Sequence, residues 1–528
     1  MDSTFDLSTT HYGVLRGNAV ESVVEFLGVP YAELRDRLAD AELIKTRQGG
    51  ILDATKDGPT AISPRQGCHL EQEAIQHTLP PKDLPQSDRH CLNLNITTPR
   101  VSLQSKSKLP VFVFIHGGGY ALGANSWPQY SLQRLNELSV RCNRPVVTVG
   151  INYRLGVFGF LTSTELREAG YSPNNGLRDQ RVAIEWVHRH IQCFGGDPSN
   201  ITIAGSSAGG ASALLHLHSE TPLFRQLISL SGTYLLLRPT TLDAQERAYQ
   251  KALDSWGLSA ATPGERIRYL LETPAEELFR NCSISVMPSI DGDLIPTDTS
   301  FAEVADPDGL HPIGKKWCQS ILIGDAAMDA SIIDFVQPEL SRNCAARFIK
   351  LVNTNLPQAA AVALLQKYHL LDEDSDSQAF LKILDYLNHV TFNQPSLAFS
   401  MGWSNRAHLY YFNEGNPWDG PYQEKATHLL DIAYLTQNFS EFLSKEQNEL
   451  ALRFAEDILK FCHGLKPWPA TGTNFHLRLY GPTHAGCMTK DSTKPFGPEV
   501  NRQDVMANLP ETVSRDTLIS IAEQFKSI

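Results

Sequence analysis

The chain has 528 residues, of which 42% are hydrophobic and 20% charged, and its formal net charge at pH 7 is −12. This composition is typical of a globular protein with a large core, and it excludes disordered and fibrous classes. The negative charge argues against a nucleic-acid partner, because binding phosphates needs a basic surface.

The N-terminal segment and the cysteines exclude further classes. Residues 1–11 include acidic side chains and lack the apolar segment of a signal peptide, so we expect an intracellular, cytoplasmic protein if Met1 is the natural start. No apolar run reaches the about 20 residues that a membrane span needs. The nine cysteines are scattered without zinc-ligand spacing, so we expect neither a metal site nor a cofactor.

Short β-rich runs alternate with helical stretches along the chain, without an internal repeat or an obvious linker. This alternation predicts an α/β fold, with a large, mostly parallel sheet that has helices on both faces. We expect one large domain over residues 1–528. The clearest strands are continuously apolar, as strands buried on both faces are, and they span residues 110–115, 145–150, 200–204, 226–230, 319–323 and 408–412.

Helical patterns fill the intervals between these strands. Residues 177–193 read as one helix, which ends in a turn at 194–198. Residues 357–390 read as a long helical insertion that caps the sheet and shapes the entrance to a pocket. Two more helices are expected at 440–462 and 516–525.

Residues 205–209, Gly-Ser-Ser-Ala-Gly, fit the pattern G-x-S-x-G between an expected strand and an expected helix. A sharp strand-to-helix turn pushes the central serine into an exposed position, and flanking glycines let the neighbouring backbones pass. The following helix N-terminus offers N–H groups to a developing oxyanion. We therefore predict Ser207 as a nucleophile, with Ser206 as the competing hydroxyl.

Three consecutive glycines, Gly117–Gly119, follow the strand at 110–115. Such a bare backbone costs conformational entropy, so something requires it there. A phosphate-binding loop would need the Lys-Ser/Thr pair of a P-loop, which is missing. The expected oxyanion donors are the N–H groups of Gly118, Gly119 and Ala208, and His116 is interpreted as a residue that braces the loop.

These motifs, together with residues 12–17, 26–32, 152–160, 175–180 and 194–203, resemble the type-B carboxylesterases and lipases, a group that includes the cholinesterases. The resemblance covers nearly the whole chain. It implies an α/β-hydrolase fold with helical cap insertions. It also implies a carboxylic ester hydrolase that acts on a small or medium organic ester through an acyl-serine intermediate.

The resemblance implies an acid in the segment Gly324–Ala330, where Asp329 takes the acid's position. Aspartate stands there instead of the family's usual glutamate, so the loop must lie closer to the histidine. Asp325 remains the first alternative and Asp334 the second. An aspartate at a strand end is otherwise often a solvated turn residue.

The resemblance also implies that His428 is the base, because residues 425–431 match the family's G-x-x-H-x-x-(D/E) pattern apart from its glycine. His408, His463 and His484 remain as alternatives. The resulting order, Ser207, Asp329, His428, is the chain order of α/β-hydrolase triads.

Several neighbours are expected to support the site. The resemblance implies that Ser231 and Asp431 lie behind the triad, and that Ser206 stands where the family commonly has an anionic glutamate. Candidates for the pocket wall, by position alone, are Tyr120, Trp127 and Tyr234, together with residues 235–237. Cys68 and Cys91 occupy the places of a disulfide that the family often has, although an intracellular protein would keep them reduced.

Two other functions remain open at this point. The same acyl-serine could serve an acyltransferase, a lactonising enzyme or a thioester-releasing enzyme, because water and another acceptor differ only in their access to the pocket. A catalytically silent interaction protein of the same fold is the other, and the three retained triad positions argue against it. The expected partner is a small-molecule ester.

Overall fold

The computed structural model describes residues 3–47, 49–104, 108–282, 284–403, 405–472, 475–482, 485–490, 504–507 and 509–527. Its strands are β1 Ser3–Thr9, β2 Gly13–Val20, β3 Val23–Pro30, β4 Ala32–Glu33, β5 Glu42–Leu43, β6 Ile51–Asp53, β7 Asn93–Pro99, β8 Leu109–Ile115, β9 Val147–Ile151, β10 Gly196–Ser206, β11 Gln226–Leu230, β12 Ser320–Ala326, β13 Ala407–Phe412, β14 Phe475–Tyr480 and β15 Ala485–Lys490.

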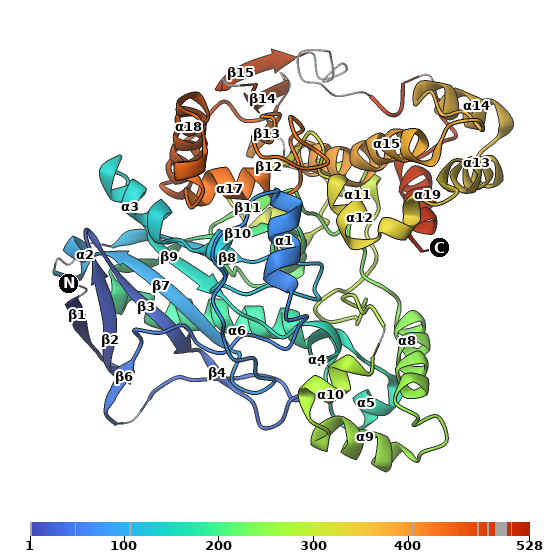
Figure 1. Ribbon diagram of the computed structural model, residues 1–528. Coiled ribbons are helices and arrows are strands. Elements are labelled where there is room, and N and C mark those ends of the chain that lie inside the picture. Colours follow the sequence, from blue (N-terminus) through green and yellow to red (C-terminus); the bar gives the residue numbers. More distant parts are fainter. Residues whose placement is uncertain are drawn as a thin grey trace.

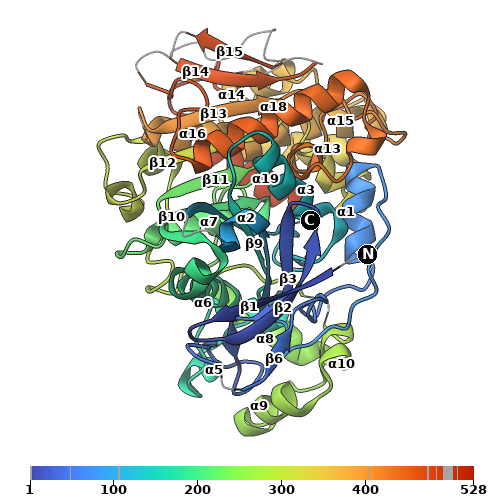
Figure 2. The same ribbon diagram turned by 90° about the vertical axis from the view of Figure 1, so that its left-hand side faces the viewer.

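Thirteen of the described strands form one twisted sheet, in the order β1-β2-β3-β7-β9-β8-β10-β11-β12-β13-β14-β15, with β6 paired to β2. The centre of the sheet, from β9 to β14, is parallel throughout. The outer pairs along this order are antiparallel, whereas β6 pairs with β2 in parallel. Figure 2 shows the N-terminal and C-terminal strands at opposite edges of the sheet. The predictions of a mostly parallel sheet and of six central strands are confirmed.

The helices of the first half are α1 Gly67–Ile75, α2 Arg100–Gln104, α3 Gln133–Arg141, α4 Gly156–Phe160, α5 Thr164–Glu168, α6 Asn175–His190, α7 Ala208–Leu215, α8 Leu242–Ser255 and α9 Pro263–Glu272. The others are α10 Ala275–Arg280, α11 Phe301–Ala305, α12 Ser331–Val336, α13 Cys344–Asn355, α14 Gln358–Lys367, α15 Asp376–Leu387, α16 Gln394–Gly402, α17 Leu430–Thr436, α18 Lys445–Cys462 and α19 Arg515–Lys526. Of the helices in the described ranges, none combines the length and apolarity needed to cross a bilayer.

Alternation along the central strands divides the core into two layers. In β8, Val111, Val113 and Ile115 point into the larger hydrophobic cluster, which includes side chains of α6 and α7. Phe112 and Phe114 point to the other face, into a cluster with side chains of α3, α17 and α18. Because both faces of each strand are covered, the strands are apolar without interruption. Figure 1 shows helices on both sides of the sheet.

Two stretches that were each predicted as one helix are interrupted in the structure. The stretch 357–390 forms two helices, α14 and α15, because a capping box of Ser375 and Gln378 starts a new helix after a turn. The second then continues as a π-helical turn, η6 Asn388–Asn393, which runs into α16. At 440–462, a 3-10 turn over Ser440–Phe442 precedes α18, which begins after its own capping serine, Ser444.

The predicted turn at 194–198 is partly wrong. The helix α6 is followed by a 3-10 turn, η2 Ile191–Phe194, and β10 already begins at Gly196. Gly196 pairs with Leu109, and the pairing is irregular up to Ile201. The bend therefore lies inside the first part of the strand, which leaves the predicted portion at 200–204 regular.

The parallel arrangement positions the site. In neighbouring parallel strands the carboxyl ends reach the same edge of the sheet, which is where open α/β sheets bind ligands. Ser207 follows β10 directly, Asp329 follows β12 after two residues, and His428 follows β13 after a longer loop.

Candidate active site

Ser207 occupies a strained turn between β10 and α7. Its backbone has φ 54° and ψ −122°, which is unusual for a residue with a side chain. The turn is held on both sides, since the Ser207 N–H donates to the Leu230 carbonyl (2.9 Å) and the Ala211 N–H donates to the Ser207 carbonyl (3.0 Å). Ser207 is partly exposed, whereas its neighbours Ser206 and Ala208 are buried.

Two glycines allow this turn to close. A Cβ atom on Gly205 would lie 2.2 Å from the backbone of Gly209, and one on Gly209 would lie 2.1 Å from the carbonyl oxygen of Ile115. Both distances are impossible contacts, so the strand and the helix can approach each other only without side chains there. The spacing of the motif is thus a packing requirement of the turn.

The glycine loop lies directly against this turn. A Cβ on Gly117 would be 3.1 Å from the Cβ of Ser207. Gly118 and Gly119 have φ values of +93° and +59°, and the Gly118 carbonyl accepts from the N–H groups of Ala121 and Leu122, each at 3.0 Å.

Three N–H groups, two in the glycine loop and one at the start of α7, have no partner in the part of the chain that the structure describes. Within the described residues, the N–H groups of Gly118 and Gly119 donate no hydrogen bond. Ala208 opens α7, where the first N–H groups have no acceptor inside the helix. These three donors remain available to a negatively charged oxygen.

Asp329 and His428 form a buried pair. The Nδ1 atom of His428 lies 2.7 Å from Oδ1 of Asp329, and the exposed fractions of the two side chains are 2% and 0%. The other carboxylate oxygen of Asp329 accepts from the Ala326 N–H (2.6 Å). The His428 N–H donates to the Ser331 hydroxyl (3.2 Å). The acid is thus held by the backbone of its own loop, and the backbone of His428 is held by the hydroxyl of Ser331 at the start of α12.

The alternative acids lie elsewhere. Asp325 is a buried residue of β12 in register with Tyr411 of β13. Asp334 lies on α12, where its carboxylate accepts from the hydroxyl of Tyr422 (2.9 Å). Of the three aspartates, Asp329 is the one that contacts His428.

Two of the alternative histidines, His408 and His463, have other partners. His408 lies inside β13 between the rings of Phe461 and Trp468, and burial lowers its pKa to about 4. His463 follows α18, and its Nε2 lies 3.2 Å from the carbonyl of Pro145. His484 lies outside the described residues.

His116 is enclosed beside the glycine loop. Its ring stacks on Tyr153 with centroids 4.5 Å apart, and its Nδ1 lies 3.0 Å from the Gly117 carbonyl oxygen. Burial lowers the pKa of His116 to about 4. A neutral ring held between a tyrosine and the loop is suited to bracing the loop backbone.

A second carboxylate, Asp431, lies behind the pair. Tyr410 donates to its Oδ2 (2.7 Å), as does Ser231 (3.3 Å), and the Ile432 N–H donates to its Oδ1 (2.8 Å). Burial, and then the negative charge of Asp329, raise the pKa of Asp431 to about 6. Ser231 therefore joins the site through Asp431.

The remaining residues predicted near the site are Ser206 and the three candidates for the pocket wall. The Ser206 hydroxyl is buried and, among the described residues, has no hydrogen-bond partner. The ring of Tyr120 packs edge-on against Phe160 (4.9 Å) in the core. Trp127 stacks beside Tyr130 (6.5 Å), and the buried Tyr234 lies edge-on to Phe399 (5.2 Å).

Cys68 and Cys91 are both free thiols. The Cys68 thiol contacts the side-chain amides of Gln129 and Gln72, each at 3.6 Å. Cys91 is completely buried, and burial raises the pKa of each thiol to about 12. Such thiols are protonated and poorly reactive at neutral pH.

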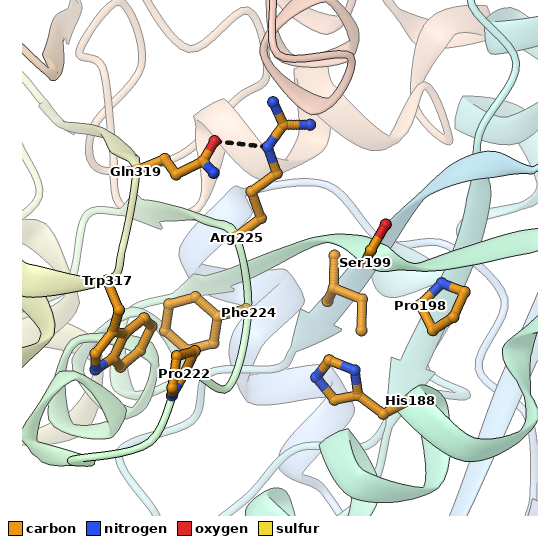
Figure 3. Close-up of a pocket in the computed structure, with 9 residues that line it drawn as sticks. His188, Pro198, Ser199, Pro222, Phe224, Arg225, Trp317 and Gln319 are labelled. Atoms are coloured by element: carbon orange, nitrogen blue, oxygen red, sulfur yellow. Dashed lines mark hydrogen bonds between the residues drawn. The ribbon is translucent and has the colours of Figure 1, made fainter.

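A surface pocket lies at the opposite end of the same strands, where β10, β11 and β12 begin (Figure 3). Its lining includes Phe224 and Trp317, with ring centroids 5.0 Å apart, and Arg225, which donates to the Gln319 side chain (2.7 Å). Ser207 follows the other end of β10, so this pocket is separate from the predicted site.

Three contacts of the site escaped the sequence analysis. Ser331 accepts from the His428 N–H, Phe392 places its ring 5.6 Å from the His428 ring, and Asn388 bonds to the backbone around Asp329. Ser331 follows Asp329 closely in sequence and could have been considered. Asn388 and Phe392 lie on a distant helical segment, without a local pattern that points to the site.

The chain is similar over most of its length to known esterases and lipases. Residues 6–487 match the sequence profile of the Carboxylesterase family. Lipase 3 of Yarrowia lipolytica is 28% identical over 469 residues, which cover 86% of this chain and 87% of that protein. Esterase cest-33 of Caenorhabditis elegans is 31% identical over 474 residues, which cover 83% of this chain and 81% of that protein.

Solved structures give the same picture of the fold. A PNB esterase superposes with a TM-score of 0.74 at 24% identity, and the match covers 92% of this chain and 97% of that one. The carboxylesterase EST55 of Geobacillus stearothermophilus superposes with a TM-score of 0.72 at 25% identity, and the match covers 92% of this chain and 98% of that one. The predicted α/β-hydrolase fold is confirmed.

Proposed function

The chain belongs to the carboxylesterase family and is a serine hydrolase of carboxylic esters, and from this premise we propose that it acts through an acyl-serine on Ser207, with His428 as base and Asp329 as acid. The observation that carries the proposal is the buried 2.7 Å contact between Asp329 and Nδ1 of His428, at the sheet edge where Ser207 follows β10. A neutral histidine bonded in this way keeps Nε2 free to accept a proton.

In the first half of the reaction, Ser207 Oγ attacks the ester carbonyl while His428 Nε2 takes its proton. The carbonyl oxygen becomes negative and is bound by the N–H groups of Gly118, Gly119 and Ala208, which have no competing acceptor in the described structure. Asp329 stabilises the imidazolium. His428 then returns the proton to the leaving alcohol, which leaves the acyl group on Ser207.

In the second half, water takes the place of the alcohol. His428 removes a proton from the water as its oxygen attacks the acyl carbonyl, and the same three N–H groups bind the oxyanion again. The tetrahedral intermediate then collapses, Ser207 recovers its proton from His428 and the carboxylic acid departs. No step requires a metal or an organic cofactor.

The substrate class we propose is a small or medium organic ester. The similarity to proteins named para-nitrobenzyl esterase supports this choice, because that name describes an ester of a small aromatic alcohol. Activated esters such as p-nitrophenyl acetate are therefore suitable first substrates.

The experiment is covalent labelling with a fluorophosphonate, which phosphonylates an activated serine, followed by peptide mass spectrometry. We expect a single modified peptide that contains Ser207, unchanged labelling in Ser206→Ala, and loss of labelling in Ser207→Ala. Labelling that persists in Ser207→Ala, or that maps to Ser206, would overturn the assignment.

A further inference from the structure

The π-helical turn η6, Asn388–Asn393, separates α15 from α16 and packs against β12, the strand that leads to Asp329. Turns of this kind are rare and occur frequently at functional sites, because the wider backbone aims side chains differently from an α-helix. The first residue of η6, Asn388, is buried, with an exposed fraction of 1%.

The carboxamide of Asn388 is bonded on both sides of the acid. Its Oδ1 accepts from the Ala330 N–H (3.1 Å), and its Nδ2 donates to the Ala327 carbonyl (2.9 Å). These two backbone groups enclose Met328 and Asp329. Because a carboxamide carries a donor and an acceptor side by side, one asparagine can hold both ends of this short loop.

The position of the Asp329 carboxylate depends on that backbone. An aspartate has only two side-chain torsions, so a shift of its Cα moves the carboxylate by nearly the same distance. One of its oxygens is 2.7 Å from His428 and the other is 2.6 Å from the Ala326 N–H. Either bond would lengthen if the loop relaxed.

The same turn also contacts the base. The ring of Phe392 lies 5.6 Å from the His428 ring, centroid to centroid. One six-residue turn therefore touches the backbone of the acid and the ring of the histidine, although both lie on other loops. A segment that served only to connect α15 with α16 would need neither contact.

We propose that Asn388 is a positioning residue for ester hydrolysis, which fixes the loop Ala327–Ala330 so that the Asp329 carboxylate stays against His428. The inference rests on the proposed triad. The side chain of Asn388 bonds to the backbone at both ends of this loop, and it acts through Asp329.

The test substitutes Asn388→Leu, which keeps the size of the side chain but removes both hydrogen bonds, and Asn388→Ala as a smaller variant that avoids overpacking. Active enzyme is counted by fluorophosphonate titration, so the rate per folded site is measured. We expect kcat for p-nitrophenyl acetate to fall about tenfold to a hundredfold, with KM nearly unchanged, because a small misplacement of a catalytic group has effects of this size.

The pH profile separates positioning from a general loss of structure. A carboxylate that lies farther from the imidazolium stabilises this protonated form of the base less. The acidic limb of kcat/KM in the Asn388 variants should therefore move to lower pH. Thr391→Val is the matched control, since Thr391 is buried in the same turn and its hydroxyl donates to the Leu387 carbonyl of the preceding helical turn. Its rate and profile should match wild type.

The double variant Asp329→Asn with Asn388→Leu distinguishes a failure of the Asn388 proposal from a failure of the proposed triad. When Asp329→Asn abolishes most activity, adding Asn388→Leu should cost little more, because the group that Asn388 positions is already lost. Independent, multiplicative losses would overturn the proposal, as would wild-type kcat and pH profile in both Asn388 variants. Full activity in Asp329→Asn alone would instead refute the triad.

Discussion

The two ends of the central parallel strands have similar residues and very different environments. At the carboxyl end lie Ser207, Asp329 and His428. At the amino end, the pocket of Figure 3 is lined by His188, Ser199 and other residues. Each end therefore has a serine and a histidine, and at the carboxyl end the histidine is paired with an acid in a buried environment.

The bonds made by these side chains explain the difference. At the amino end, His188 is exposed, with its Nε2 against the carbonyl of Leu223 (2.8 Å), and the Ser199 hydroxyl donates to Asp197 (2.7 Å). At the carboxyl end the acid and the histidine bond to each other while both are buried, and an ionic contact there is much stronger than at the surface. Residue types alone do not produce a nucleophile; their pairing and burial do.

Helix direction reinforces the contrast. The helix α7 begins immediately after Ser207 and points its free N–H groups toward the serine. The helix α6 reaches the amino end with its C-terminus, which carries His188, Arg189 and His190. The fold thus presents helix N–H groups at one end and helix carbonyl groups at the other.

Replacing one serine at each end of the strands should give the largest difference in the rate of ester hydrolysis. Ser207→Ala should lower kcat for p-nitrophenyl acetate by about 10⁵-fold or more, because loss of the nucleophile removes the covalent route. Ser199→Ala should hydrolyse the ester like wild type. Initial rates of both variants, at equal protein concentration, test this, and comparable activity in Ser207→Ala would refute the role of that serine.

Exchanging the acid should have the second-largest effect. Asp329→Asn should lower kcat by about 10³- to 10⁴-fold, since an amide no longer stabilises the imidazolium or selects its tautomer. Asp325→Asn, four residues earlier and equally buried, is the matched control and should retain most of the activity. If the losses were reversed, Asp325 would be the acid.

The contrast between the two ends also explains which features could be predicted from sequence. The six central strands and the elbow at Ser207 follow from local patterns, since buried strands are continuously apolar and a tight elbow needs glycines at fixed spacing. The break in the stretch 357–390 was not predicted, although it could have been, because Ser375 and Gln378 have the spacing of a capping box.

The partners of the acid could not be predicted in this way. Asp329 and His428 were identified through a family resemblance, because no local pattern joins residues 99 positions apart. Asn388 bonds to groups 58 and 61 positions away, and an asparagine within a helical stretch has no distinctive pattern. Contacts of this kind depend on how distant loops meet at the edge of the sheet.

Burial at the carboxyl end should appear in the pH dependence of stability. The pKa of Asp431 is raised from 3.8 to about 6 by burial and by the charge of Asp329. The folded protein therefore holds this proton more tightly than the unfolded chain, so its contribution to stability is lost as the pH rises from about 4 to about 6. Asp431→Asn has no such proton to lose.

We expect the melting temperature of Asp431→Asn, relative to wild type, to increase as the pH is raised across that interval. Thermal unfolding of both proteins at about pH 4 and at about pH 7 measures the change. The amide alters the bonds to Tyr410 and Ser231 at every pH, so the difference between the two pH values is the quantity to compare. A melting-temperature difference that stays constant, or that decreases, as the pH rises would contradict a raised pKa of Asp431.

The smallest effect is expected at the amino end, where Arg225 connects three strands. Its side chain donates to Gln319 before β12 (2.7 Å) and to Asn200 of β10 (3.0 Å), while its own residue precedes β11. Arg225→Ala should lower the free energy of unfolding by about 1 kcal/mol, because a partly exposed hydrogen bond contributes little net stability. Arg225→Lys should lose a similar amount of stability, since an ammonium does not reproduce the planar fork of the guanidinium.

Neither Arg225 variant should change kcat/KM for p-nitrophenyl acetate, because Ser207 lies at the other end of β10. A fall in kcat/KM with unchanged stability would show that the amino end takes part in catalysis, and the distinction between the two ends would not hold.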